Sequence, residues 1–112
     1  MPRDVVDEIK REIAENKIVL YMKGTPEEPR CGFSAAAADV LRQIGAPFKA
    51  VNVLEDREKW QAIREYSNWP TIPQLYVDGQ FIGGCDIMRE MFFKGELQPL
   101  IQKALGGTPQ EP

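Results

Sequence analysis

The tetrapeptide at positions 31–34, Cys-Gly-Phe-Ser, is the segment of this sequence best suited to thiol chemistry. Cys31 supplies one thiol, and Ser34 stands three residues later, where a Cys-x-x-Cys redox motif has its second thiol. Because a serine hydroxyl cannot form a disulfide, dithiol chemistry within this turn is excluded. Any redox or ligand chemistry in this segment therefore rests on Cys31.

The loop before Cys31 predicts that the thiol lies at the start of a helix. Residues 23–30 are polar, with a proline on either side of two acids, and they follow an apolar run of strand length. Backbone N–H groups at a helix start favour a negative charge, and Lys23 and Arg30 add to this effect, so we expect the thiol pKa to fall below its free value of about 8.5. The two acids oppose the shift. A lone cysteine is more often a small buried apolar residue, but its place after a polar loop favours a reactive thiol.

Residues 69–73, Trp-Pro-Thr-Ile-Pro, form a second candidate site segment directly before a predicted strand. An X-Pro bond adopts cis at modest cost, and a proline here would turn the backbone so that its free N–H and C=O groups face outward instead of pairing in a sheet. The alternative is a proline that merely begins an edge strand.

Residues 83–86, Gly-Gly-Cys-Asp, form a third candidate segment at the start of another predicted helix. Two glycines leave the helix N-terminus uncrowded, so that its N–H groups can hold a carboxylate while Asp86 binds an ammonium group. A simple N-cap is an equal alternative for Asp86. Cys85 is interpreted either as a small buried residue or as an auxiliary thiol that captures oxidised Cys31.

Composition predicts one compact domain. The chain has 112 residues, of which 43% are hydrophobic, enough for one core but not for two. A net charge of −3 with dispersed Lys and Arg argues against nucleic-acid binding. No apolar stretch approaches the roughly 20 residues of a membrane span, and the N-terminal residues read as neither signal nor transit peptide. We therefore predict a cytoplasmic protein whose two cysteines are thiols.

Hydrophobic periodicity alternates between helix and strand along the chain. A βαβ unit in the first half predicts parallel pairing, and Asp78-Gly79 predicts a hairpin turn in the second half. The expected elements are a helix with Val5, Val6, Ile9 and Ile13 on one face, strand 18–22, helix 35–44, strand 48–53, a helix from Glu55 or Asp56 to about 66 with Trp60, Ile63 and Tyr66 or Ser67 on its apolar side, strands 74–77 and 80–83, and helices 85–94 and 96–105.

The order α-β-α-β-α-β-β-α is that of the thioredoxin-like fold, and four motifs in matching order sharpen the comparison. Segments 23–26 (Lys-Gly-Thr-Pro), 31–34, 69–73 and 83–86 together resemble the monothiol glutaredoxins of the CGFS type over about residues 5–105. This resemblance implies an α/β, three-layer fold with a central four-stranded mixed sheet flanked by helices. We expect a glutaredoxin domain at 1–105, as in the short single-domain members, and a flexible C-terminal tail at 106–112.

The resemblance also implies a ligand, glutathione. In the family, the backbone before the proline pairs with the cysteinyl part of the tripeptide, which carries over to Thr71 and Ile72. The 83–86 segment, with Cys85 and Asp86, suits the γ-glutamyl end, and Lys23 binds the glycyl carboxylate.

A [2Fe–2S] cluster is the second implied cofactor. It needs four soft ligands, and a chain with two cysteines and no histidine cannot supply them alone. The resemblance implies that Cys31 from each of two protomers and the thiols of two glutathiones complete the set, giving a cluster-bridged homodimer. A rival arrangement is a zinc or cluster site made by Cys31 and Cys85 of two protomers, without glutathione.

One position departs from the family pattern. Related sequences usually have an arginine where this chain has Trp60, and that arginine helps to bind the glycyl carboxylate. On a helix, Arg57 and Arg64 share the face of Trp60, and either could replace the lost cation. Arg64 is favoured because a cation near a helix C-terminus is stabilised by the dipole. Alternatively, Trp60 only covers core and Lys23 binds the carboxylate alone.

Two function classes follow from this pattern. A carrier would hold a labile cluster on Cys31 and deliver it to iron–sulfur recipient apoproteins. A monothiol oxidoreductase would instead remove glutathione from proteins, with at most weak activity. A scaffold for assembly partners or BolA-like proteins is compatible with the carrier. We predict the carrier.

Overall fold

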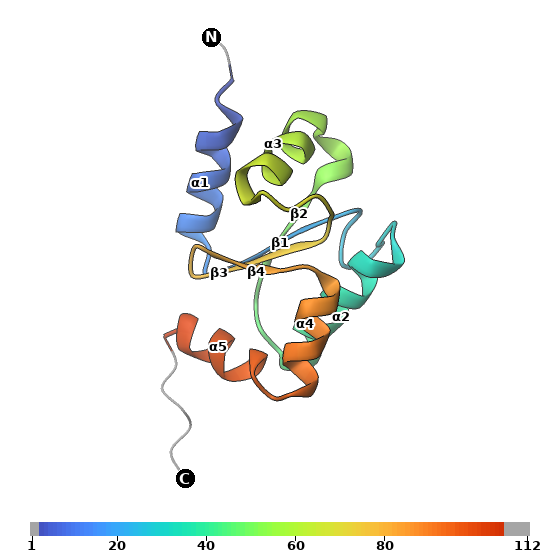
Figure 1. Cartoon of the computed structure of the whole chain (residues 1–112), viewed down its shortest axis with the longest axis vertical. Helices are drawn as coiled ribbons and strands as arrows, with labels where there is room; N and C mark the ends of the chain where they lie inside the picture. The colour runs from blue at the N-terminus through green and yellow to red at the C-terminus, as the bar shows by residue number, and fades with distance from the viewer. Residues whose placement is uncertain (1–2, 107–112) are drawn as a thin grey trace.

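A computed structural model describes residues 3–106, so the predicted tail, apart from Gly106, lies outside the described residues. Figure 1 shows the arrangement of the elements. In chain order they are α1 (Val5–Glu15), β1 (Ile18–Met22), α2 (Gly32–Ile44), β2 (Lys49–Asn52), the 3₁₀ turn η1 (Val53–Glu55), α3 (Arg57–Ser67), β3 (Gln74–Val77), β4 (Gln80–Gly83), α4 (Cys85–Phe93) and α5 (Leu97–Ala104).

The four strands form one mixed sheet in the order β2-β1-β3-β4. β1 runs parallel to β2 and antiparallel to β3, and β3 forms a hairpin with β4. At the hairpin turn Asp78 and Gly79 have φ angles of 51° and 81°, as a two-residue turn with two left-handed residues requires. The predicted parallel βαβ unit and the predicted hairpin are both confirmed.

Alternation along β1 divides the core into two parts. Ile18, Leu20 and Met22 point into a cluster with α2, α4 and α5, whereas Val19 and Tyr21 point into a cluster with α1 and α3. Because successive side chains of a strand face opposite sides, one buried central strand serves both clusters. The sheet is therefore the middle of three layers, with α1 and α3 on one face and α2, α4 and α5 on the other (Figure 1). The predicted α/β thioredoxin-like fold is confirmed.

Several predicted boundaries and faces were wrong. Val53 belongs to a 3₁₀ turn rather than to the strand before it, whereas helix α2 begins at Gly32, directly after Cys31, and includes the expected 35–44 stretch. Val6 is 42% exposed and Tyr66 is 38% exposed, so neither belongs to the buried face of its helix. In α3 the predicted Ile63 is buried, and so is Lys59, the residue before Trp60.

The Lys59 side chain can be buried because its positive charge pairs with a carboxylate of α1. Its Nζ atom lies 2.5 Å from Oε2 of Glu12, and the Tyr21 hydroxyl donates a hydrogen bond to the other oxygen of that carboxylate at 2.7 Å. This group joins α1 to α3 on one face of the sheet, and α3 is the helix that carries Trp60 and Arg64. Within the described residues, no helix is long and apolar enough to cross a membrane.

Candidate functional site

Cys31 is the N-cap residue of α2, with extended backbone angles (φ −154°, ψ 136°). The side chain is only half-buried, so solutes can reach the sulfur. It makes no capping hydrogen bond of ordinary length. Even so, the N–H of Ser34 lowers the pKa of the Cys31 thiol most, and the Phe33 N–H, the Ser34 hydroxyl and the Lys23 ammonium group lower it further, while partial burial opposes them. The structure thus agrees with the predicted thiol at a helix start.

Ser34 has a role that sequence reasoning missed. The side chain is completely buried, and its Oγ accepts a hydrogen bond from the backbone N–H of Lys23 at 3.0 Å. The residue that replaces a second thiol therefore joins the first turn of α2 to the chain that leaves β1.

The loop between β1 and α2 is closed on itself beside the thiol. The Arg30 N–H donates to the Lys23 carbonyl at 2.9 Å, and the Gly24 N–H donates to the side chain of Asn52 at 2.9 Å. Gly24 has φ +90°, and an added Cβ would lie 2.4 Å from the Glu28 carbonyl oxygen. Only glycine fits both the angle and the space, which explains the glycine of the 23–26 motif.

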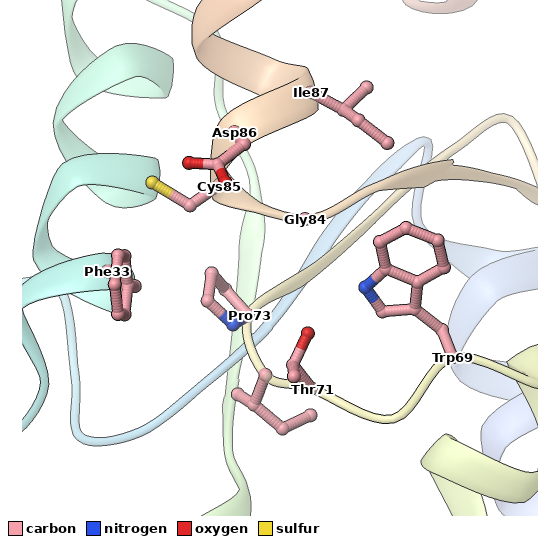
Figure 2. Close-up of a pocket in the computed structure, with 9 residues that line it drawn as sticks. Phe33, Trp69, Thr71, Pro73, Gly84, Cys85, Asp86 and Ile87 are labelled. Carbon is pink, nitrogen blue, oxygen red and sulfur yellow. The ribbon is translucent and has the colours of Figure 1, made fainter.

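A cavity of about 330 Å³ opens between the two other candidate segments. Figure 2 shows its lining, with the Trp69–Pro73 loop below and the start of α4 above. Four predicted site residues line it (Thr71, Ile72, Cys85 and Asp86), together with Phe33, Trp69, Pro73, Gly84 and Ile87. Phe33 is 63% exposed and brings the 31–34 motif to the cavity. Phe33, Trp69 and Gly84 belong to the motifs identified in the sequence. Ile87 lies just after the 83–86 motif, and no feature of the sequence indicated that it lines a site.

The backbone at Ile72 is available to a ligand. The Ile72–Pro73 peptide bond is cis, the form that sequence analysis considered for this segment. Among the hydrogen bonds of residues 3–106, none uses the N–H or the C=O of Ile72, although the residue is only 6% exposed. Since buried backbone groups are nearly always paired, this peptide edge suits a partner that is itself a peptide.

Cys85 and Asp86 differ sharply in their exposure. Cys85 is 6% exposed, and in Figure 2 its sulfur points toward α2. Burial raises the pKa of the Cys85 thiol, with Arg89 opposing the rise. Asp86 is exposed in the first turn of α4, and the N-cap of that helix is Gly84, so the N-cap alternative for Asp86 was wrong. Both cysteines are free thiols in the structure.

Gly84 keeps the cavity open at the start of α4. A Cβ placed on it would lie 3.2 Å from the Pro73 carbonyl oxygen and 3.3 Å from Nε1 of Trp69. That indole nitrogen is buried and has no hydrogen-bond partner within the described part of the chain. A side chain at position 84 would therefore require the Trp69–Pro73 loop to shift by a few tenths of an ångström.

Lys23 and Arg64 meet at Trp60 instead of lining this cavity. The Lys23 Nζ lies 5.2 Å from the centre of the Trp60 ring, and the Arg64 Cζ lies 5.8 Å from it. The Nε–H of Arg64 also donates to the Trp60 carbonyl at 3.3 Å. Arg57 is exposed, and within residues 3–106 no contact places it over this ring. Of the two arginines considered from sequence, the structure brings Arg64 to Lys23 and Trp60.

Comparison with known proteins decides the family. Residues 18–82 match the family described as Glutaredoxin. Glutaredoxin 4 of Pasteurella multocida is 47% identical over 108 residues, which are 96% of this chain and 99% of that protein. The chain belongs to the glutaredoxin family.

Further matches place this glutaredoxin among the monothiol members. A ycf64-like monothiol glutaredoxin of Synechocystis is 50% identical over 93 residues, covering 83% of this chain and 87% of that one. The solution structure of reduced poplar apo GrxS14 superimposes with a TM-score of 0.79 at 46% identity, over 90% of this chain and 93% of that chain. The single thiol of the 31–34 motif agrees with this placement.

Proposed function

We propose that this monothiol glutaredoxin carries a [2Fe–2S] cluster that is held with glutathione and delivered to recipient apoproteins. The observation that carries the proposal is the accessible Cys31 thiol, whose pKa is lowered at the start of α2 and which has no second thiol at position 34. A thiolate is a soft ligand for iron, and one thiolate per chain calls for outside donors. Cys31 of two protomers and two glutathione thiols make up four, so the holo form is a cluster-bridged homodimer.

The glutathione would lie along the cavity described above. Its cysteinyl part pairs with the backbone at Thr71 and Ile72, and its γ-glutamyl end lies at the start of α4, with the carboxylate near the helix N–H groups and the ammonium near Asp86. Cys85 forms part of the wall beside that end. Its burial and raised pKa make it a poorer cluster ligand than Cys31, which speaks against the four-cysteine dimer.

The glycyl carboxylate would lie near Lys23 and Arg64. Neither cation forms a salt bridge with another residue in the range 3–106, so both charges are available to an anion. The aromatic ring of Trp60 holds both cations in place through cation–π contacts. In this arrangement Trp60 does not bind the carboxylate itself, as an arginine at that position would. It instead positions Lys23 and Arg64, which bind the carboxylate.

The experiment that tests the carrier is an absorption spectrum after reconstitution with iron, sulfide and glutathione. We expect visible sulfur-to-iron charge-transfer bands and a dimer on gel filtration, both dependent on glutathione. A monomer without visible absorption would contradict the proposal. Recipient apoproteins and BolA-like proteins are the proposed partners, and a cytoplasmic location and a domain at residues 1–105 stay predictions.

The lowered pKa of Cys31 also favours a second function, protein deglutathionylation. The thiolate attacks the glutathione sulfur of a protein–glutathione disulfide, so that the protein thiolate leaves and Cys31 becomes glutathionylated. A second glutathione thiolate then attacks this mixed disulfide, which releases oxidised glutathione and restores the Cys31 thiolate. We expect slow turnover, and turnover at the rate of a dithiol glutaredoxin would make this the principal function.

A further inference from the structure

The loop that leads to Pro73 is fastened from inside the fold by the side chain of Gln74. This residue opens β3 and is completely buried. Its amide nitrogen donates hydrogen bonds to the carbonyl of Trp69 at 3.1 Å and to the carbonyl of Thr71 at 3.2 Å. Both amide hydrogens are therefore used on one short loop, and that loop is the wall of the cavity.

Tyr76 fixes the orientation of this amide. Its hydroxyl lies 3.2 Å from Oε1 of Gln74 and donates to it. Burial raises the pKa of Tyr76 to about 12, so the hydroxyl is protonated at neutral pH and can act as the donor. The ring is packed against Tyr21 and Phe81, with centroids 5.6 and 5.4 Å away. The amide of Gln74 consequently has one favourable orientation, with its oxygen toward Tyr76 and its nitrogen toward the loop.

The hydrogen bond from Gln74 to the Thr71 carbonyl determines the direction of the Ile72 N–H. The Thr71 carbonyl and the Ile72 N–H belong to one peptide unit, which is planar and trans. In a trans peptide the C=O and the N–H point in opposite directions. Because Gln74 holds the carbonyl inward, the Ile72 N–H is directed away from Gln74, and it has no partner among residues 3–106.

We propose that Gln74, oriented by Tyr76, is a positioning residue that directs the Ile72 N–H toward the backbone of bound glutathione. The inference rests on the proposed glutathione site and adds the side chain that orders it before the ligand arrives. A peptide edge that is already ordered binds a strand-like ligand without a further loss of loop entropy.

The test is a titration with S-methylglutathione, which binds without redox chemistry, followed by the NMR shift of the Ile72 amide. Gln74→Glu keeps the shape of the side chain but turns a carboxylate toward two carbonyls, so we expect binding at neutral pH to weaken by about tenfold or more. Lowering the pH should restore part of the affinity, because a protonated carboxyl group donates one hydrogen bond. Tyr76→Phe leaves the donors but releases their orientation, and we expect about a two- to fivefold loss.

Gln80→Glu is the matched control, since it makes the same chemical change at an exposed position of the neighbouring strand β4. It should bind as the wild type does. A folded Gln74→Glu variant that binds at all pH values with wild-type affinity would overturn the inference. If that variant does not fold, Tyr76→Phe decides, and unchanged affinity there overturns it equally. A wild-type protein that binds no S-methylglutathione would instead refute the glutathione site itself, and the inference with it.

Discussion

The Oγ atom of Ser34 lies 3.0 Å from the backbone nitrogen of Lys23 and accepts its hydrogen bond. The contact joins the chain leaving β1 to the first turn of α2. It also places the hydroxyl where it helps to lower the pKa of Cys31. Ser34 thus contributes to both the stability and the reactivity of the thiol segment.

Ser34→Ala should therefore have two measurable effects. Removing the hydroxyl leaves the partly buried Lys23 N–H without its partner, so we expect the free energy of unfolding to fall by about 0.5–1.5 kcal/mol in urea denaturation. The pKa of Cys31 should rise, seen as a later appearance of thiolate ultraviolet absorbance on raising the pH. Cys31→Ser identifies which part of that absorbance belongs to Cys31. An unchanged titration in Ser34→Ala would assign Ser34 a purely structural role.

Sequence patterns predicted the sheet and the helix order because β1 is apolar throughout and the hairpin turn has a specific chemistry at Asp78-Gly79. In α3 they predicted the buried Ile63 but missed the buried Lys59. A lysine reads as exposed, and nothing local shows that Glu12, on another helix, neutralises Lys59. Gln74 was overlooked for a similar reason. Its role depends on two carbonyls and a tyrosine hydroxyl that come together only in the folded chain.

The two thiols should differ in their reaction with iodoacetamide. Only the thiolate reacts, the pKa of Cys31 is lowered and its side chain is accessible, whereas burial raises the pKa of Cys85. We expect a short pulse at neutral pH to label Cys31 almost alone, as read by mass spectrometry of peptides. The pH at half-maximal rate for Cys31 should lie below about 8.5. Equal labelling of both cysteines, with Cys85→Ser as the single-thiol reference, would contradict the assigned difference.

Cluster ligation should also separate the two cysteines. Cys31→Ser should fold but lose the sulfur-to-iron charge-transfer bands after reconstitution, because a hydroxyl is a hard and poorly ionised donor. Cys85→Ser should keep those bands, since glutathione supplies the remaining thiols. Loss of the cluster in both variants, with no need for glutathione in the wild type, would support the four-cysteine dimer instead. A full-strength cluster in Cys31→Ser would refute Cys31 as the ligand.

Arg64 should contribute to glutathione binding through the glycyl carboxylate. Arg64→Ala removes one of the two cations held on Trp60, so we expect glutathione affinity to fall by about 1 kcal/mol or more, as for a hydrogen bond to a charged group, and the cluster to be lost faster. Trp60→Arg, which restores the usual family cation, should slow cluster loss. Calorimetric titration and the decay of visible absorbance measure the two quantities.

A modified ligand shows whether the effect comes from the carboxylate. Glutathione esterified at its glycine carries no charge at that end, so the wild type should bind it more weakly than glutathione. In Arg64→Ala this preference should shrink, because part of the charge recognition is already gone. Arg57→Ala removes an exposed arginine from the same helix and should leave the preference intact. If Arg64→Ala discriminates between the two ligands as well as the wild type does, Arg64 is a solvated surface charge and Lys23 binds the carboxylate alone.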